Sequence, residues 1–273
     1  KNLQKIYGKD ETKKFFKNSV EGSNYTKSII QNYNIDCDVS GECNFILAHH
    51  PNKFKQIREQ AEIYKNEFGI ETEIYSKEEF DKIGHTGTEQ YGALSYKPGF
   101  AINPLKFVNG ITKYALSKKL KIFDHSLVKK IEKNNNSYIL RTSEGSVNTK
   151  KIVVATNGFY QEGLVPQMNS RILPVISNII VTRKLSKNEI DLHNFKTYSP
   201  IMNTKNLLYY YRKLPDNRIL FGTRGDFIGS DQSNFNRSKT MEKFFKNIFP
   251  DWSEISIDYS WRGFIAMSQK LTP

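Results

Sequence analysis

The sequence predicts an α+β protein that contains an α/β element and divides into two domains. Three features of the chain lead to this class. Helical stripes alternate with short strands up to about residue 120, strand alternation then takes over, and long antiparallel strand candidates dominate the second half. With 273 residues, of which 38% are hydrophobic, the chain is long enough to bury one large core or two modest ones.

The first quarter of the chain predicts two helices separated by a strand. Asp10 is a candidate N-cap for a helix that extends to Ile30, with a flaw at Gly22 in its middle. Residues 41–48 follow as a strand, and Asn52 is expected to begin the second helix. The apolar residues of this second helix recur at helical spacing: Phe54, Ile57, Ala61, Tyr64 and Phe68.

Two further helices have clear start signals. After a short strand at residues 71–75, Ser76 and Glu79 have the spacing of a capping box, which predicts a helix that ends at residues 84–87. Asn103 then precedes Pro104, a residue that suits the first helical position. We expect the helix after Pro104 to bury the face formed by Leu105, Val108, Ile111, Ala115 and Leu116.

Strand character replaces helical periodicity after Leu120. Residues 122–147 predict a small antiparallel meander with turns rich in Asn and Gly. The continuous β-branched run at residues 152–155 predicts a strand covered on both faces, which ends in the turn Thr156-Asn157-Gly158. We expect this strand to be buried, with Asn157 and Gly158 facing an open groove.

The second half predicts an antiparallel sheet with a helix on one face. Met241 to Ile248 has the apolar spacing of a helix, and Pro215-Asp216-Asn217 is a turn between two strands. The strand candidates are residues 172–185, 207–214, 218–222 and 255–261. A sheet with a helix packed on one face is a stable layered arrangement.

Composition narrows the classes of function. The chain has 41 basic and 28 acidic residues, a net charge of +13, but its lysines are scattered among acids rather than gathered in a stripe. We therefore expect no nucleic-acid partner, and a non-catalytic basic protein that binds an anionic partner is the alternative function. The sequence shows neither an apolar stretch near the ~18 residues of a membrane span nor a secretory signal, so a cytoplasmic location is expected.

The histidines and cysteines do not predict a metal site. His49 and His50 are neighbours, whose side chains point to opposite faces in a strand, and no spaced partners accompany them. Cys37 and Cys43 lack the C-x-x-C spacing of zinc and redox sites. We expect no bound metal and two free thiols.

Five stretches of the chain carry a resemblance to a known family through their order along the sequence. They are Asn103-Pro104-Leu105, Ser126-Leu127-Val128, residues 153–158 (Val-Val-Ala-Thr-Asn-Gly), residues 210–222 with the turn Pro215-Asp216-Asn217, and Trp261-Arg262-Gly263 followed by Ala266 and Pro273. In this order they resemble the FAD-dependent oxidoreductases of the D-amino-acid-oxidase type. The resemblance is greatest to the gamma-glutamylputrescine oxidoreductase-like amine oxidases.

The resemblance implies FAD as the cofactor and a small-molecule amine as the substrate. The amine would lose a hydride from the carbon beside its nitrogen, and the imine would then be hydrolysed. The implied cofactor-binding residues are Val128, Ala155, Thr156, Asn157, Gly158, Trp261 and Gly263, and the implied substrate pocket contains Tyr210, Tyr211 and Ile265. The competing interpretations are ordinary strands, turns and core packing, and strand alternation allows only one of the two tyrosines to face the pocket.

One position bears on the choice of substrate. Amino-acid oxidases of this superfamily have an Arg two residues past the Gly of the return segment, where it binds the substrate carboxylate. This chain has Ile265 at that place. The difference favours an amine or a gamma-glutamyl amine over a free amino acid, although Arg224 or Arg262 remains an alternative source of positive charge.

The chain also departs from the family in its cofactor motifs, and the glycine-rich C-terminal flavin segment is one that it lacks. It contains no G-x-G-x-x-G between a strand and a helix, the motif that holds a dinucleotide's pyrophosphate. We therefore expect an internal piece of a longer flavoenzyme that does not hold FAD alone. The implied domains are residues 1–40 and 101–165 (partial FAD-binding domain), 41–100 and 166–262 (substrate domain with an antiparallel sheet), and 263–273 (return segment to the FAD domain).

Overall fold

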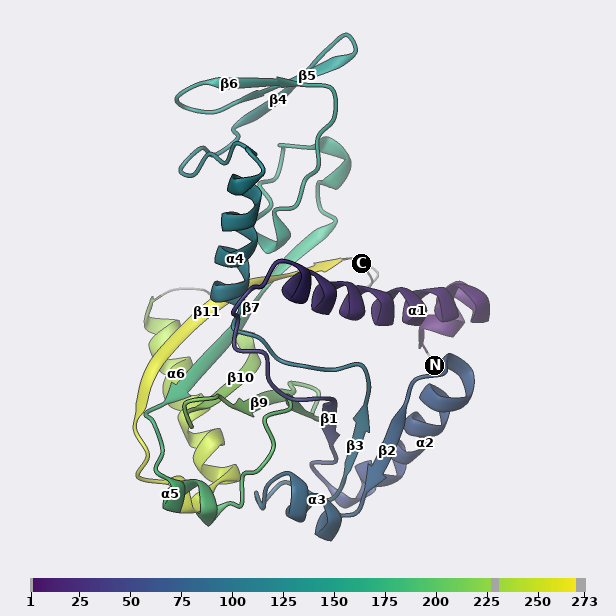
Figure 1. Ribbon diagram of the computed structural model, residues 1–273, viewed down its shortest axis with the longest axis vertical. Coiled ribbons are helices and arrows are strands. Elements are labelled where there is room, and N and C mark those ends of the chain that lie inside the picture. Colours follow the sequence, from purple (N-terminus) through teal and green to yellow (C-terminus); the bar gives the residue numbers. More distant parts are fainter. Residues whose placement is uncertain (1, 227–230, 269–273) are drawn as a thin grey trace.

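The protein is built around one large mixed sheet. The computed structural model describes residues 2–226 and 231–268 (Figure 1). All neighbouring strands of the sheet are antiparallel except β1 and β8, which run parallel. The strand order is β11 (Ile257–Ser268), β7 (Ile172–Thr182), β10 (Ile219–Asp226), β9 (Tyr209–Lys213), β8 (Ile201–Asn203), β1 (Asn44–Leu47), β3 (Ala93–Tyr96) and β2 (Thr72–Tyr75).

The main core lies on one face of this sheet, beneath α5 (Lys187–Leu192), α6 (Asp231–Ile248) and η3 (Pro250–Trp252). Alternate side chains of β9, such as Tyr209 and Tyr211, are buried there, because successive residues of a strand point to opposite faces. Trp252 is completely buried and still donates its indole N–H to the carbonyl oxygen of Glu189, at 2.7 Å. The side chains that alternate with these, such as Tyr210 and Arg212 of β9, point to the opposite face of the sheet.

A second core lies at the other end of the sheet, where α2 (Pro51–Phe68) packs on β1, β2 and β3. The start of α2 differs from the expected one. His50, not Asn52, is the N-cap, and its ring accepts a hydrogen bond from the N–H of Asn52. The helix α3 (Lys77–Ile83) begins at Ser76 with the predicted capping box, in which Ser76 and Glu79 exchange hydrogen bonds.

The helix α1 (Asn2–Asn32) crosses beside α2, and Phe16 stacks on Phe68 with 4.1 Å between ring centroids. The expected flaw at Gly22 is wrong, since the helix passes through that residue without interruption. The kink falls instead at Gly8, whose φ of 79° is accessible to glycine without a Cβ penalty. No cap by Asp10 is seen among the described residues.

The upper part of the molecule in Figure 1 is a smaller unit, which we call the lobe and define as residues 104–171. It contains α4 (Pro104–Ser117), η1 (Asn157–Phe159) and η2 (Pro166–Met168). A separate three-stranded antiparallel sheet, the predicted meander, is formed by β4 (Lys130–Asn134), β5 (Ser137–Arg141) and β6 (Ser146–Thr149). It lies at the end of the lobe farthest from α5 (Figure 1).

Two expectations about the lobe are wrong. The helix α4 begins at Asn103 as predicted, yet it buries no residue, and Leu105 and Val108 are 69% and 56% exposed. Residues 152–155 form no strand, and Val153 is 89% exposed. An apolar face becomes buried only where another element covers it. Phe107 and Tyr114 of α4 pack against residues 30–37, but Leu105, Val108 and Val153 stay exposed.

Candidate active site

An open groove of about 1060 Å³ lies on the face of the large sheet opposite the main core. Its floor is formed by side chains from four adjacent strands, which the sheet register brings into rows. One row across the sheet contains Tyr210, Gly222, Ile179 and Trp261, in that order. The loop before α4 forms the opposite wall with Phe100, Ile102, Asn103 and Pro104.

Tyr210 is held flat across the sheet. Its hydroxyl shares a hydrogen bond of 2.6 Å with the hydroxyl of Ser177 on β7, so the ring must pass over β10. At that crossing the chain has Gly222, where an added Cβ would lie 2.1 Å from the tyrosine ring. Burial raises the pKa of Tyr210, which keeps the phenol protonated near neutral pH.

Tyr211 points the other way, as strand alternation requires. It is 3% exposed, and its hydroxyl lies 2.9 Å from Nε2 of His85 inside the main core. Nδ1 of His85 accepts the N–H of Gly87, so the neutral ring donates from Nε2 to Tyr211. Of the two tyrosines, Tyr210 therefore presents its ring to the groove, and core packing accounts for Tyr211.

Trp261, Gly263 and Ile265 alternate along β11 and so share one face of that strand. Trp261 is 44% exposed and lines the groove. An added Cβ at Gly263 would meet nothing within 4 Å, which leaves open space above the strand. Ile265 is half-buried, farther along β11 toward the lobe. Of the return segment 263–273, residues 269–273, which include Pro273, lie outside the described residues.

The turn at residues 156–158 is docked onto β11. The side-chain oxygen of Asn157 accepts the N–H of Ala266, at 3.0 Å, and that of Gly158, at 2.8 Å. Gly158 is buried, and an added Cβ would lie 2.7 Å from Cβ of Phe264. The expectation that Gly158 faces an open groove is therefore wrong, and its lack of a side chain is explained by close packing on β11.

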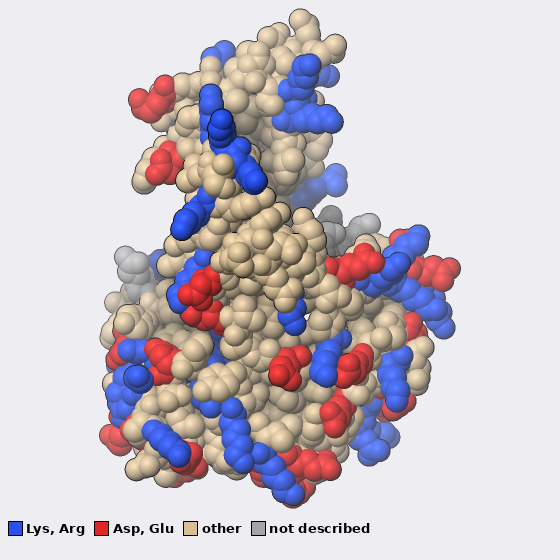
Figure 2. All heavy atoms as spheres, in the orientation of Figure 1, with Lys and Arg blue, Asp and Glu red and all other residues tan. Residues whose placement is uncertain are grey.

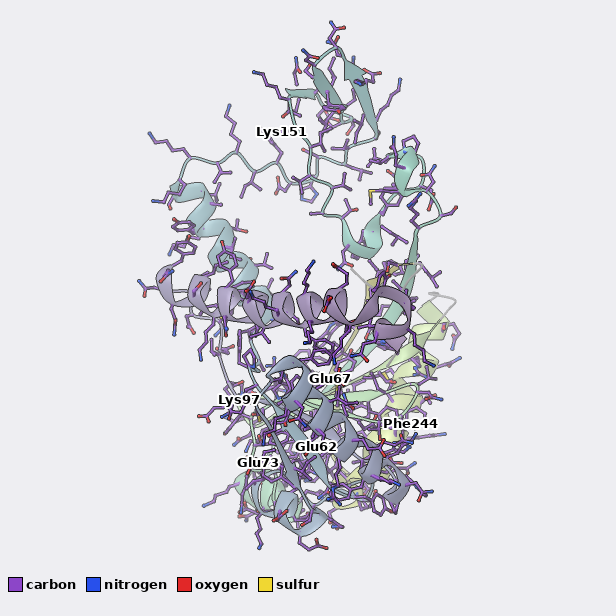
Figure 3. All side chains as sticks on the ribbon, turned by 90° about the vertical axis from the view of Figure 1, so that its right-hand side faces the viewer. Glu62, Glu67, Glu73, Lys97, Lys151 and Phe244 are labelled. Carbon is purple, nitrogen blue, oxygen red and sulfur yellow. The ribbon has the colours of Figure 1, made fainter. Side chains whose placement is uncertain are left out.

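Two segments of the lobe, residues 122–128 and 152–156, belong to no helix or strand. Within residues 2–226 and 231–268, no partner is found for the backbone N–H groups of residues 122–128 and 152–156. Val128 is half-buried in the first segment, and Ala155 and Thr156 are exposed in the second. Exposed N–H groups beside small residues fit a phosphate-bearing or adenine-bearing cofactor. Figure 3 shows Lys151, the residue before the second segment, in the lobe. It lies away from the rest of the molecule, which we call the body.

Sequence reasoning did not single out Arg212. This residue lies two positions after Tyr210 on β9, lines the groove and donates from Nη2 to the carbonyl oxygen of Ile102, at 2.7 Å. The available signal was strand alternation, which places Tyr210 and Arg212 on the same face. Neither Arg224 nor Arg262, the two arginines considered from the sequence, lines the groove.

The remaining titratable candidates belong to the scaffold. Nδ1 of His49 lies 2.8 Å from the hydroxyl of Thr204, and His50 caps α2. Cys37 and Cys43 are free thiols, as expected. In the described part of the chain, no cluster of metal-ligating side chains is found, and no helix combines the length and apolar character needed to cross a bilayer. Figure 2 shows basic and acidic side chains interspersed on the visible face of the body.

Comparison with known proteins identifies the family. A family model described as FAD dependent oxidoreductase, or DAO, matches residues 4–273. A probable oxidoreductase OrdL of Haemophilus influenzae is 27% identical, and the match covers 98% of this chain and 61% of that protein. The gamma-glutamylputrescine oxidoreductase of Escherichia coli is 26% identical, with 96% of this chain and 60% of that protein covered. The chain thus spans about three fifths of the length of these relatives.

Solved structures share the fold. Glycine oxidase from Geobacillus kaustophilus superposes with a TM-score of 0.73 at 15% identity, covering 92% of this chain and 65% of that one. L-proline dehydrogenase from P. horikoshii gives a TM-score of 0.72 at 20% identity, covering 93% and 67%. The likeness confirms a mixed α+β fold of the FAD-dependent oxidoreductase type. The chain belongs to the DAO family of FAD-dependent oxidoreductases.

Proposed function

We propose that this chain provides the substrate groove of an FAD-dependent amine oxidoreductase. The observation that carries the proposal is the groove itself, where Tyr210 and Trp261 form an aromatic surface on the sheet face opposite the core. Support also comes from the match to a gamma-glutamylputrescine oxidoreductase along 96% of the chain. Membership in an oxidoreductase family favours this function over that of a non-catalytic protein for anionic partners.

FAD, when bound, accepts a hydride from the carbon beside the amine nitrogen. The residues proposed to hold it are Val128, Ala155 and Thr156 on the adenine and ribose side, and Trp261 and Gly263 near the ring. The unpaired N–H groups of residues 122–128 and 152–156 and the open space above Gly263 support this placement. Because Asn157 and Gly158 are docked on β11, their contribution is to fix the position of the second segment.

The chain's own part in the reaction is to bind and orient the amine and to exclude water. The hydrogen bond with Ser177 fixes the ring of Tyr210, and Trp261 forms the next wall in the same row. The protonated phenol of Tyr210 is suited to hydrogen-bond a substrate and not to remove its proton, since burial raises its pKa. An electron-rich aromatic surface also favours the approach of a cationic amine before it loses its proton.

The amino acid at position 265 bears on which amines react. Ile265 gives a carboxylate beside the reacting carbon no bidentate partner, a loss of about 1.5 to 3 kcal/mol. We therefore expect the FAD-loaded oxidoreductase to have a higher kcat/KM for a monoamine, a diamine or a gamma-glutamyl amine than for glycine, sarcosine or D-alanine. The Ile265→Arg variant should narrow this gap.

Steady-state turnover of these substrates by the wild type and the Ile265→Arg variant is the test, with anaerobic bleaching of the flavin as a second measurement. A faster reaction with a free amino acid in the wild type would overturn the preference for amines. A flavin that no amine reduces would overturn the proposed function as a whole.

A further inference from the structure

The groove contains an arginine whose hydrogen-bonding capacity is largely unused. Arg212 has five N–H donors, and among the described residues its side chain has one hydrogen-bond acceptor, the carbonyl oxygen of Ile102. No carboxylate of the described residues lies within salt-bridge distance of it. The guanidinium is half-buried, and burial lowers its pKa. A partly desolvated cation in this state gains free energy when an anion joins it.

The two carboxylates that line the groove near Arg212 already form ion pairs with other residues. Asp38 forms an ion pair with Lys106 and accepts a hydrogen bond from Asn103. Asp216 at the other rim is paired with Arg218, at 3.1 Å. The charge of Asp38, which lines the groove, offsets part of the effect of burial on the pKa of Arg212. No carboxylate of the described residues, however, accepts a hydrogen bond from the guanidinium of Arg212.

The position of Arg212 decides which part of a substrate it reaches. Tyr210 and Arg212 point to the same face of β9 and lie two residues apart, a separation of about 7 Å along a strand. The side chains also diverge, since Tyr210 extends over β10 to Ser177 whereas Arg212 is directed to the carbonyl oxygen of Ile102 on the opposite wall. A carboxylate directly on a reacting carbon held between Tyr210 and Trp261, as in a free α-amino acid, is therefore expected to lie short of Arg212. An amine with a carboxylate on a distant arm can place its reacting carbon there and still reach Arg212.

We infer that Arg212 binds a carboxylate carried at the far end of the amine substrate, and so selects acidic amides of diamines over uncharged ones. The inference rests on the proposed amine oxidation. It assigns the recognition of the substrate's carboxylate to Arg212 on β9, because Ile265 on β11 offers no positive charge. The guanidinium would use its unpaired donors for the carboxylate and keep its bond to Ile102, which fixes its orientation.

Two probes isolate the carboxylate. N-glutarylputrescine and N-butanoylputrescine have the same reactive amine and the same amide, but only the first ends in a carboxylate. The FAD-loaded wild type should prefer the glutaryl probe by about 10- to 100-fold in kcat/KM, the range for a charge-assisted hydrogen bond. In Arg212→Gln the preference should fall to near unity, through a higher KM for the glutaryl probe with little change in kcat.

Two further variants make the test specific. Arg212→Lys keeps the charge and should restore part of the preference, and its flavin content reports whether the fold is intact. Arg58→Gln removes an exposed arginine of α2 that does not line the groove, and should leave the preference unchanged.

Equal turnover of the two probes by the wild type would overturn the inference and leave amine oxidation standing, as would an unchanged preference in Arg212→Gln. Oxidation of neither probe, nor of any other amine, would overturn the proposed function and the inference with it.

Discussion

The body of the molecule and the lobe contain similar apolar sequences, but those in the body are buried and those in the lobe are exposed. In the body, the β-branched run of β7 is buried, with Ile180 and Val181 at 1% and 4% exposed. In the lobe, the run at residues 152–155 belongs to no strand, and Val153 is 89% exposed. The strand β7 has β10 on one side and β11 on the other, whereas no described strand lies beside residues 152–155.

The difference shows what an apolar pattern specifies. A β-branched run favours an extended backbone by itself, but the ladder hydrogen bonds and the burial come from neighbouring strands. The same holds for α4, which starts at its predicted cap and presents an apolar face to solvent. An apolar pattern of this kind predicts the local structure and shows which face has to be covered to become buried. The element that covers this face must come from other residues.

The largest expected effect compares two phenylalanines, one in each region. Phe221 in the core is 0% exposed and Phe123 in the lobe is 66% exposed. Phe221→Ala should lower the free energy of unfolding by about 3 to 5 kcal/mol, because it leaves a cavity in a packed core. Phe123→Ala should change it by less than about 0.5 kcal/mol. Urea denaturation of this chain measures both, and similar values for the two variants would contradict the comparison.

The next effect compares two glycines of the same sheet. Gly222→Ala should destabilise the protein by about 1 to 3 kcal/mol, because its Cβ would overlap the ring of Tyr210. It should also weaken amine binding by displacing that ring. Gly263→Ala meets nothing within 4 Å and should leave stability unchanged.

If the open space above Gly263 receives the flavin, Gly263→Ala should reduce the flavin content of the oxidoreductase without changing its melting temperature. Thermal melts and the flavin-to-protein absorbance ratio separate the two effects. An unstable Gly263→Ala variant would show that this space is filled by the protein's own atoms.

The parts predicted from the sequence are those that depend on few neighbours. The capping box at Ser76 and the cap at Asn103 are local arrangements of residues three apart, and both are present. The cap at His50 was missed because His is a rare N-cap, and its Nδ1 accepts the bond that an Asn or Ser oxygen usually accepts. The partner of Arg212, Ile102, lies 110 residues away in the chain, so no local pattern reveals that contact.

The body should also respond to pH through His85. This ring is completely buried, and burial lowers its pKa to about 3. The unfolded chain binds a proton near pH 6.5 and the folded chain does not, so stability is full above pH 6.5 and is lost as the pH falls toward 3. The expected slope is about 1.4 kcal/mol per pH unit below pH 6.

Denaturation of wild type and of a His85→Gln variant between pH 4 and 7 measures this slope, which should be smaller in the variant. His193, also buried, has its pKa lowered by burial and should account for part of the remaining slope. His125→Gln in the lobe is the control, since that side chain is 96% exposed. A slope that His85→Gln leaves unchanged would show that His85 is not the group that titrates.

The smallest expected effect concerns two serine hydroxyls. Ser177 on β7 shares its hydrogen bond with Tyr210, whereas Ser126 in the lobe donates to the carbonyl of Asp124 in an exposed segment. Ser177→Ala should cost about 1 kcal/mol of stability, because it leaves the hydroxyl of the half-buried Tyr210 without its partner. Ser126→Ala should cost almost nothing. In the FAD-loaded oxidoreductase, Ser177→Ala should raise KM for the amine more than it lowers kcat, since a loosened Tyr210 positions the substrate less well. If Ser177→Ala changed stability but left KM unaltered, Tyr210 would be a packing residue of the groove floor and not a contact of the substrate.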